Sequence, residues 1–300
     1  MKVCWIGLGN MGSPMATHLS KAGYDVVGFD LSPSVREAVG ESGLTTASSA
    51  IDAARGADIV FTMLPKGEHV HAAILESGVL DALAADALVV DCSTISTGDA
   101  RAVAAVVNAS GRGFLDAPVS GGTNGAENGT LTFMVGGTVD DLRTVRPLLS
   151  AMGSRIFRAG AVGAGQSAKL INNMMLAMNM QSLCESAVLA QKLDVDPQTV
   201  IEIAGASTGN SWVLNNYYPV GGAIASAPSS RDFTGGFAVT LMHKDLGLAL
   251  DAAEEHRLEL AATVEVSRRL QHLIDEGFGA LDFSSLIRLI DGSVPVGVSQ

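Results

Sequence analysis

Three glycines near the start of the chain limit what it can fold into more than any other feature. Gly7, Gly9 and Gly12 form a G-x-G-x-x-G pattern that follows an apolar run and precedes a stretch suited to a helix. Glycines at this spacing permit a tight turn between strand and helix, and they let a pyrophosphate approach the backbone. The start of the helix adds free N–H groups and partial positive charge. Because such glycines can also serve only a packed turn, a second signal is needed before a ligand is inferred.

An acidic residue at the end of the next apolar run supplies that signal. Asp30 lies 18 residues after Gly12, where a carboxylate would accept hydrogen bonds from an adenine-ribose diol. Leu31 follows it in place of an arginine that would pair with a 2′-phosphate, so NAD is favoured over NADP. Arg36 is a cation close to Asp30 and so argues in part for NADP, but it is interpreted as a solvated helix residue. The predicted cofactor-binding residues of this region are Gly7, Gly9, Asn10, Met11, Gly12, Asp30 and Leu31.

Up to about residue 160, strand-like runs alternate with alanine-rich helical stretches. The runs are VCWIGL, DVVGFD, IVFTML, LVVDCS, GFLDAPV and TFMVGG, and the helices are expected at 11–22, 33–41, 48–55, 68–76, 97–110 and 139–151. Alternation of this kind predicts a mainly parallel sheet with helices on both faces. The expected fold is therefore α/β, a Rossmann-type doubly wound sheet, followed by an all-helical domain.

The pattern changes after GAVGAG, where strand-like runs stop. The expected division is a dinucleotide-binding domain over 1–162 and a helical substrate and dimerisation domain over 163–300. A helix at about 166–193, free of Gly and Pro, would open the second domain and reach roughly 42 Å. Residues 208–237, rich in Gly, Ser, Asn and Pro, predict a long loop.

Composition restricts the class of partner. Hydrophobic residues make up 47% and charged residues 17% of the 300 residues, as in globular proteins. The net charge of −12 disfavours binding to nucleic acid or to an anionic membrane surface. Polar residues interrupt the apolar segment 166–193, which predicts an interior helix and no membrane span.

The first residues and the cysteines bear on location and metal binding. MKVCWIGLGN lacks the basic, apolar and cleavage regions of a signal peptide, so a cytoplasmic location is expected. Cys4, Cys92 and Cys184 are scattered, without a CxxC pair, which predicts buried thiols. No disulfide and no metal site is expected.

Four motifs in order give the chain a family resemblance. They are GLGNMGSPMA at the start, DAPVSGG at 116–122, GAGQSAKLINN at 163–173 and KDLGLA at 244–249. With them the chain resembles the β-hydroxyacid dehydrogenases over essentially its whole length. The resemblance implies NAD-dependent oxidation of a small hydroxy acid at a CH–OH group, without a metal.

The resemblance places the reaction at Lys169, as base towards the hydroxyl in oxidation, with Asn173 orienting the substrate. The two stand i and i+4 on the expected long helix and so lie on one face. Loss of hydration and a nearby positive charge both favour a neutral amine, the form that accepts a proton. The alternatives are a lysine that reaches out of an interior helix, and an asparagine that forms a helix–helix hydrogen bond.

Other residues of the motifs match binding positions of the family. Ser120, Gly121 and Gly122 follow a strand and can present backbone N–H groups to the substrate carboxylate, although an ordinary turn would use the same residues. The remaining cofactor positions implied by the resemblance are Leu64, Pro65, Thr94 and Lys244. Taken alone, Lys244 would be interpreted as a solvated helix charge and Asp245 as a local structural partner.

The substrate stays open. The resemblance favours oxidation of 3-hydroxyisobutyrate to methylmalonate semialdehyde, a step of valine catabolism. The alternative within the same fold is an NAD-dependent dehydrogenase or reductase that acts on serine, tartronate semialdehyde or 4-hydroxybutyrate, because few pocket contacts distinguish these compounds. Decarboxylating phosphogluconate relatives carry a glutamate where this chain has Leu176, which argues against that chemistry. A catalytically silent dinucleotide sensor is the alternative of another class.

The long apolar helix also bears on assembly. Its surface exceeds what a small helical domain can cover, which leaves a flank for a second subunit. A homodimer or a homotetramer is therefore expected.

Overall fold

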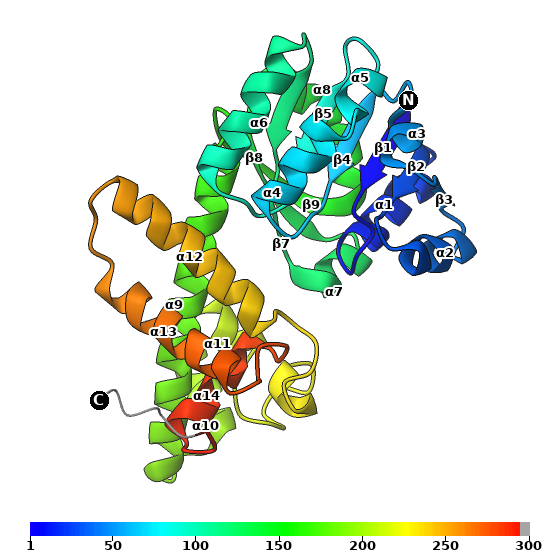
Figure 1. Ribbon diagram of the computed structural model, residues 1–300. Helices are drawn as coiled ribbons and strands as arrows, with labels where there is room; N and C mark the ends of the chain where they lie inside the picture. The colour runs from blue at the N-terminus through cyan, green and yellow to red at the C-terminus, as the bar shows by residue number, and fades with distance from the viewer. Residues whose placement is uncertain (295–300) are drawn as a thin grey trace. The chain divides into compact units, whose positions relative to one another are not determined.

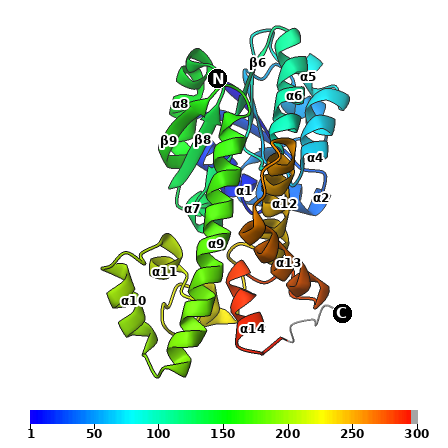
Figure 2. The same cartoon turned by 90° about the vertical axis from the view of Figure 1, so that its left-hand side faces the viewer.

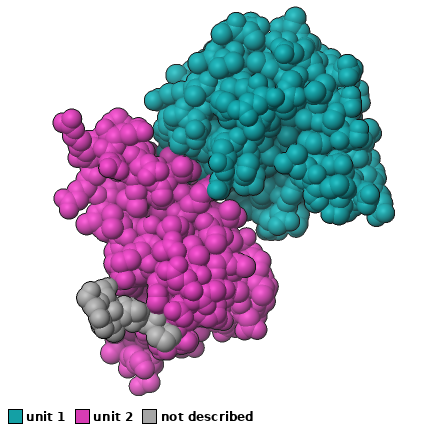
Figure 3. Space-filling model, in the orientation of Figure 1, with its two compact units in different colours: residues 1–169 teal, residues 170–300 magenta. Residues whose placement is uncertain are grey.

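A computed structural model describes residues 1–294. The chain divides into two compact units, Met1–Lys169 (unit 1) and Leu170–Gln300 (unit 2), coloured separately in Figure 3. One helix, α9 (Ala164–Lys192), begins in unit 1 and continues into unit 2 (Figure 2). It covers the stretch from which the sequence predicts a long helix. The domain boundary at 162/163 stays a prediction.

Unit 1 is built on one sheet with the strand order β3-β2-β1-β4-β5-β6-β8-β7, and β9 pairs with β8. The first six strands in this order have the Rossmann arrangement and are all parallel. Strand β8 runs antiparallel to β6 and β7 but parallel to β9. The strands are β1 (Lys2–Ile6), β2 (Asp25–Phe29), β3 (Thr45–Thr46), β4 (Ile59–Thr62), β5 (Leu88–Asp91), β6 (Gly113–Asp116), β7 (Val119–Ser120), β8 (Leu131–Gly136) and β9 (Gly153–Gly160). The predicted fold class is confirmed.

Helices cover both faces of this sheet (Figure 1). In β1, Val3 and Trp5 point into the core beneath α1, α2, α7 and α8, whereas Cys4 and Ile6 point into the core beneath α3, α4, α5 and α6. This alternation follows from the two-residue period of a strand and explains why strands buried on both faces are apolar throughout. The helices are α1 (Gly12–Lys21), α2 (Pro33–Glu41), α3 (Ala50–Ala54), α4 (Gly67–His71) continued by a π-helical turn (Ala72–Glu76), α5 (Val79–Ala82), α6 (Thr97–Ala109), α7 (Gly122–Glu127) and α8 (Val139–Met152).

One long strand escapes prediction from the sequence. Strand β9, GSRIFRAG, follows α8 and lies parallel to β8. It contains two arginines and most of its residues are exposed, as is common for a strand at the edge of a sheet. Without an apolar run or clear alternation, it lacks the signal by which buried strands are recognised.

Unit 2 is helical and has its own core. Its elements after α9 are α10 (Pro197–Gly205), α11 (Trp212–Asn216), a 3₁₀ turn (Pro228–Arg231), α12 (Val239–Glu255), α13 (Ala261–Asp275), a second 3₁₀ turn (Phe283–Leu286) and α14 (Ile287–Ile290). Helices α12 and α13 pack side by side (Figure 1). The sequence predicts one long loop over 208–237, but α11 and a 3₁₀ turn lie within this segment. No helix in residues 1–294 is long and apolar enough to cross a membrane.

A buried carboxylate holds the segment that leads into α12. Asp282 is fully buried, and its Oδ2 accepts a hydrogen bond from Phe237 N (2.7 Å). Its Oδ1 accepts from Ser284 N (2.9 Å) and Ser284 Oγ (2.6 Å). Burial raises the pKa of Asp282 from 3.8 to about 6. Because the native state then holds the proton more tightly than the unfolded chain, the stability contributed by Asp282 falls as the pH rises from about 4 to about 6.

We expect Asp282→Ala to lower the free energy of unfolding by about 2–4 kcal/mol, because the buried N–H of Ser284 and the partly buried N–H of Phe237 lose their acceptor. Asp291→Ala is the matched control, since Asp291 accepts one exposed hydrogen bond, from Ser293 N. Its cost should stay below about 1 kcal/mol. Thermal and denaturant unfolding at two pH values measures both variants. The Asp282→Ala deficit should be larger near pH 4.5 than near pH 7, and equal losses in the two variants would contradict the assignment.

Candidate active site

The glycine turn lies between β1 and α1. Gly7 has a φ of +96°, and a Cβ there would collide with the carbonyl oxygen of Met63. A Cβ on Gly12 would collide with the carbonyl oxygen of Gly7, which also accepts a hydrogen bond from Trp5 Nε1 (2.9 Å). A Cβ on Gly9 would meet no other described atom within 4 Å. Protein packing therefore requires the first and third glycines, whereas the second keeps the backbone open to a pyrophosphate.

The start of α1 suits an anion. No side chain among the described residues caps this helix, and its first turn has no acidic residue. By contrast, serine or threonine side chains cap α2, α6 and α8. The first N–H groups of a helix lack intrahelical partners and carry partial positive charge. Together with the open backbone at Gly9, the start of α1 fits the pyrophosphate of a dinucleotide.

Asp30 follows β2 beside the glycine turn. Its Oδ2 accepts a hydrogen bond from Leu8 N (2.9 Å), and its Oδ1 accepts one from Ser32 N (2.9 Å). A carboxylate oxygen has two lone pairs, so each oxygen keeps one for a further donor. The carboxylate is thereby oriented and can still accept hydrogen bonds from a ribose diol.

Arg36 is not the solvated helix residue that the sequence suggests. Its Nη1 donates to the carbonyl oxygens of Asp30 (2.5 Å) and Leu31 (3.2 Å). The side chain of Leu31 is 86% exposed. The guanidinium is thus bound to the backbone, and an apolar side chain stands next to Asp30, where NADP-binding proteins often place an arginine.

The other predicted residues of unit 1 lie where parallel strands end. Leu64 and Pro65 follow β4, and Thr94 follows β5. Leu64 N donates to Ser93 Oγ (2.9 Å), which ties the two strand ends together. Since β1, β2, β4 and β5 are parallel, these residues share one sheet edge with the glycine turn. Ligands of doubly wound sheets bind at this edge.

Ser120 ends β7, Gly121 is the N-cap of α7, and Gly122 is the first residue of this helix. Gly121 and Gly122 have φ values of +134° and +61°, a region that side chains other than glycine rarely adopt. Both glycines are exposed. This segment can present backbone N–H groups to a carboxylate without obstruction by side chains.

Lys169 and Asn173 lie on α9, one turn apart on the same face. Lys169 is 8% exposed and Asn173 is 1% exposed. Backbone contacts group Lys169 with unit 1 and Asn173 with unit 2.

Within unit 2, Asn173 is bonded to a buried acid. Asn173 Nδ2 donates to Asp245 Oδ2 (2.5 Å), and its Oδ1 accepts from Asn172 Nδ2 (3.1 Å). The other oxygen of Asp245 pairs with Lys244 Nζ (3.2 Å). The helix–helix hydrogen bond left open by the sequence is therefore present, between α9 and α12. Lys244 is not simply a solvated charge, because it pairs with an acid that is 3% exposed.

Sequence reasoning assigns no role to two residues of the family motifs, Asp116 and Gln166. Both are fully buried and hydrogen-bonded at the start of α9. Their only signal in the sequence is their position in DAPVSGG and GAGQSAKLINN.

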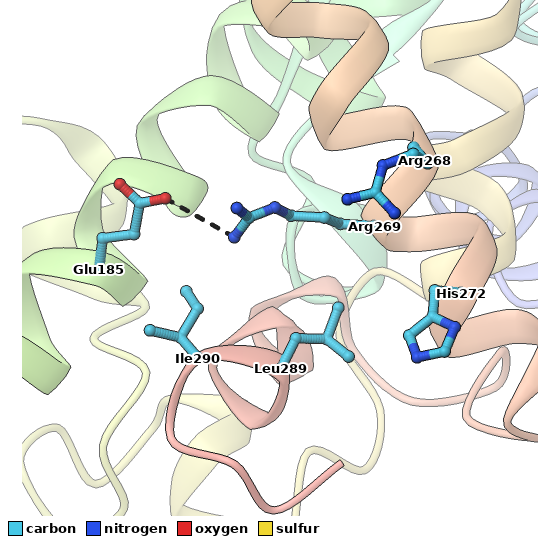
Figure 4. Close-up of a pocket in the computed structure, with 6 residues that line it drawn as sticks. All are labelled: Glu185, Arg268, Arg269, His272, Leu289 and Ile290. Atoms are coloured by element: carbon cyan, nitrogen blue, oxygen red, sulfur yellow. Dashed lines mark ion pairs between the residues drawn. The ribbon is translucent and has the colours of Figure 1, made fainter. Parts of the chain in front are cut away.

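A separate hollow of about 260 Å³ lies in unit 2 (Figure 4). Its lining includes Arg268, Arg269 and Glu185, and no sequence-predicted site residue. Arg268 and Arg269 both pair with Glu265, and Arg269 also pairs with Glu185. Since both guanidinium groups already have carboxylate partners, this hollow offers little to an anionic substrate.

The three cysteines are free and buried. Burial raises the pKa of the Cys4 thiol to about 12, which makes it a poor nucleophile. Residues 1–294 contain no group of three or more His, Cys, Asp or Glu side chains suited to a metal ion.

Both parts of the chain match models of known protein families. Residues 2–160 match the family model described as the NAD binding domain of 6-phosphogluconate dehydrogenase, and residues 163–290 match that of the NAD-binding of NADP-dependent 3-hydroxyisobutyrate dehydrogenase. The 3-hydroxyisobutyrate dehydrogenase of Pseudomonas aeruginosa is 43% identical, over 97% of this chain and 98% of its own. The chain belongs to the β-hydroxyacid dehydrogenase family.

Two further relatives in this family carry serine in their descriptions. An NAD-dependent L-serine dehydrogenase of Pseudomonas aeruginosa is 43% identical, over 97% of this chain and 98% of its own. A solved structure of Mycobacterium tuberculosis 3-hydroxyisobutyrate dehydrogenase with L-serine has a TM-score of 0.90 and 40% identity, over 96% of this chain and 98% of that one.

Family membership establishes the general activity. The chain is an NAD-dependent oxidoreductase that acts on the CH–OH group of a small hydroxy acid. The glycine turn, the start of α1 and Asp30 fit the cofactor as described above.

We expect NAD to be used at least tenfold more efficiently than NADP, equivalent to about 1.4 kcal/mol in transition-state binding. The reason is the carboxylate of Asp30 beside Leu31, which would repel a 2′-phosphate and offer it no guanidinium. The double variant Asp30→Ala, Leu31→Arg should narrow or reverse the preference. Steady-state kcat/KM values with each cofactor measure it, and equal efficiencies in the wild type would refute the assignment.

Proposed function

We propose that this enzyme oxidises 3-hydroxyisobutyrate to methylmalonate semialdehyde with NAD. The observation that carries the proposal is a buried lysine, Lys169, one helical turn from a buried amide, Asn173. Both lie in the segment GAGQSAKLINN of a chain that belongs to this family. Burial of a lysine is costly because the charged amine loses hydration. Burial therefore favours the neutral amine, which is the form that can accept a proton.

In the proposed reaction, Lys169 accepts the proton of the substrate hydroxyl. Ser120, Gly121 and Gly122 bind the substrate carboxylate through backbone N–H groups, and Asn173 donates its second amide hydrogen to the substrate. When bound, NAD would supply the acceptor for the hydride of the carbinol carbon. The products are the aldehyde, NADH and one proton, so atoms and electrons balance. The chain thereby contributes orientation and acid–base chemistry.

The proposed cofactor site consists of the glycine turn with Asn10 and Met11, the Asp30–Leu31 pair, and the strand-end residues Leu64, Pro65 and Thr94. Lys244 is included on the strength of the family match. Its pairing with Asp245 gives it a fixed position on α12, which suits contact with a phosphate or ribose group.

L-serine is a second candidate substrate, favoured by the serine dehydrogenase relative and by the solved structure with L-serine. Both acids have a carboxylate and a primary alcohol, and they differ in a methyl against an amino group. The roles above fit either acid, because such a difference is decided by few pocket contacts. NADH formation from NAD ranks 3-hydroxyisobutyrate, L-serine and 4-hydroxybutyrate by kcat/KM, and NADH consumption tests the reduction of tartronate semialdehyde. A higher value for L-serine would overturn the first choice.

Lys169→Ala should lower kcat by roughly 10²–10⁴-fold, the usual range for a lost acid–base group, and leave NADH affinity nearly intact. Lys169→Arg should not restore activity, since a guanidinium stays protonated near neutral pH. Asn173→Ala should cost less and act partly through KM. Steady-state kinetics and NADH fluorescence titration separate these effects. More than a tenth of the wild-type kcat in Lys169→Ala would remove the lysine from the mechanism.

We also propose that the chain forms a homodimer, or a tetramer of dimers, through unit 2. Leu189 near the end of α9 is 59% exposed, Leu193 directly after this helix is 64% exposed, and Ile203 of α10 is 63% exposed. No residue of α10 is buried, although the helix is rich in apolar side chains. Exposed apolar surface of this kind is typical of a subunit interface.

Light scattering at micromolar protein concentration should report at least twice the mass of 30.8 kDa. Leu189→Glu together with Leu193→Glu should shift the protein towards the monomer, because burying two charges at an apolar interface is unfavourable. The exposed replacement Lys192→Glu on the same helix is the charge control and should leave the mass unchanged. A monomeric wild type would contradict the proposed assembly.

A further inference from the structure

The first turn of α9 is capped by a side chain from a distant strand. Asp116, at the end of β6, is fully buried. Its Oδ1 accepts a hydrogen bond from Gly163 N (2.7 Å), and its Oδ2 accepts one from Gln166 N (2.9 Å). These N–H groups lie where a helix has no internal acceptors. The carboxylate therefore satisfies them and also opposes the positive end of the helix dipole.

A second side chain binds the same turn to the loop after β5. Gln166 is fully buried, and its Nε2 donates to the carbonyl oxygen of Ser93 (2.8 Å). Its Oε1 accepts from Ile95 N (3.2 Å). Both ends of one amide are thus bonded on either side of Thr94, a proposed cofactor residue. The start of α9 is held from two directions, by β6 and by this loop.

Glycines make room for this arrangement. A Cβ on Gly136 would collide with Asp116 Oδ1. A Cβ on Gly165 would lie 2.8 Å from Asp116 Oδ2, and one on Gly163 would lie 2.8 Å from Thr97 Cγ2. A larger residue at Gly163 or Gly165 would push the helix away from the start of α6 or from the carboxylate. This close approach gives a physical reason for the glycines in GAGQSAK.

Lys169 follows Gln166 by three residues, so its Cα lies about 4.5 Å further along the helix axis. The direction in which a helical residue projects is determined by the rotation of the helix about its axis. A first turn bonded through both a carboxylate and an amide cannot rotate or slide without breaking buried hydrogen bonds, each of which is costly to lose. The bonds of Asp116 and Gln166 therefore restrict where Lys169 can place its amine.

We infer that Asp116 and Gln166 are positioning residues that hold Lys169 in register with the Thr94 loop for proton transfer. The inference rests on the proposed role of Lys169. Displacement of a reacting group by about 1 Å can cost about 10²-fold in rate. Loss of the Gln166 bonds should therefore reduce kcat far more than it reduces cofactor binding.

Gln166→Met is the test variant, since methionine keeps the length and most of the volume of the side chain but loses both hydrogen bonds. Ser167→Ala is the control in the same turn, because Ser167 Oγ donates only to Gly163 O (3.0 Å) and contacts Thr97 Oγ1 (3.4 Å). Gln166→Met should lower kcat by about 10- to 100-fold and leave the Kd of NADH within about twofold. Ser167→Ala should change each value by less than about twofold.

Hydrogen exchange provides a readout that needs no turnover. In Gln166→Met, amides of a peptide over 163–172 should exchange several-fold faster than in wild type and in Ser167→Ala, while peptides over 176–190 stay unchanged. Asp116→Asn should show the same local increase. If Gln166→Met fails to fold, Gln166→Asn, which keeps the amide but shortens its reach, takes its place with the same expectations.

The outcomes separate the inference from the proposed function. A kcat within twofold of wild type in Gln166→Met, a loss confined to NADH affinity, or unchanged exchange over 163–172 would each overturn the positioning role. If the wild type oxidises none of the hydroxy acids, or if Lys169→Ala keeps its kcat, the proposed function fails while the exchange experiment still tests whether the first turn of α9 is held.

Discussion

Close packing of backbone on backbone at the end of β1 is the constraint on which the nucleotide-binding unit depends. Gly7 lies against the carbonyl of Met63, and Gly12 lies against the carbonyl of Gly7. Trp5 holds this turn through its indole N–H and stacks on Phe61 at 5.1 Å in the core. The turn directs α1 back over the sheet and leaves its first N–H groups open. The fold and the anion site are therefore produced by the same few atoms.

The strands and the cofactor residues could be predicted because their signals are local in the sequence. Apolar runs buried on both faces, such as β4 and β5, are visible without tertiary information, and so is the glycine turn before Asp30. Strand β9 could not be predicted, since an exposed edge strand needs no apolar pattern. The contacts of Asp245 with Asn173 and of Asp116 with Gln166 join residues 72 and 50 positions apart, and no local pattern encodes such pairings.

An acidic protein that binds an anionic cofactor and an anionic substrate must offset its own charge locally. The net charge is −12, and two carboxylates, Asp91 and Asp116, are buried at neighbouring strand ends. Burial raises the pKa of Asp91 to about 6 and raises that of Asp116 as well. Both accept hydrogen bonds from backbone N–H groups. Backbone N–H groups thus compensate the charge of these two buried carboxylates, and the open N–H groups at the start of α1 are left for the cofactor.

The contacts of Asn173 determine what its substitution can reveal. One amide hydrogen is committed to Asp245 and one lone pair to Asn172, so a single donor and a single acceptor remain for substrate. Removing the Asn173 amide would also leave Asp245, which is 3% exposed, without this hydrogen bond. Loss of a hydrogen bond to a buried carboxylate is costly. A loss of activity at Asn173 would therefore combine substrate orientation with disturbance of Asp245 and its ion pair with Lys244. Gln166 makes its side-chain bonds to Ser93 and Ile95 instead, so its substitution leaves the Asn173–Asp245 bond in place.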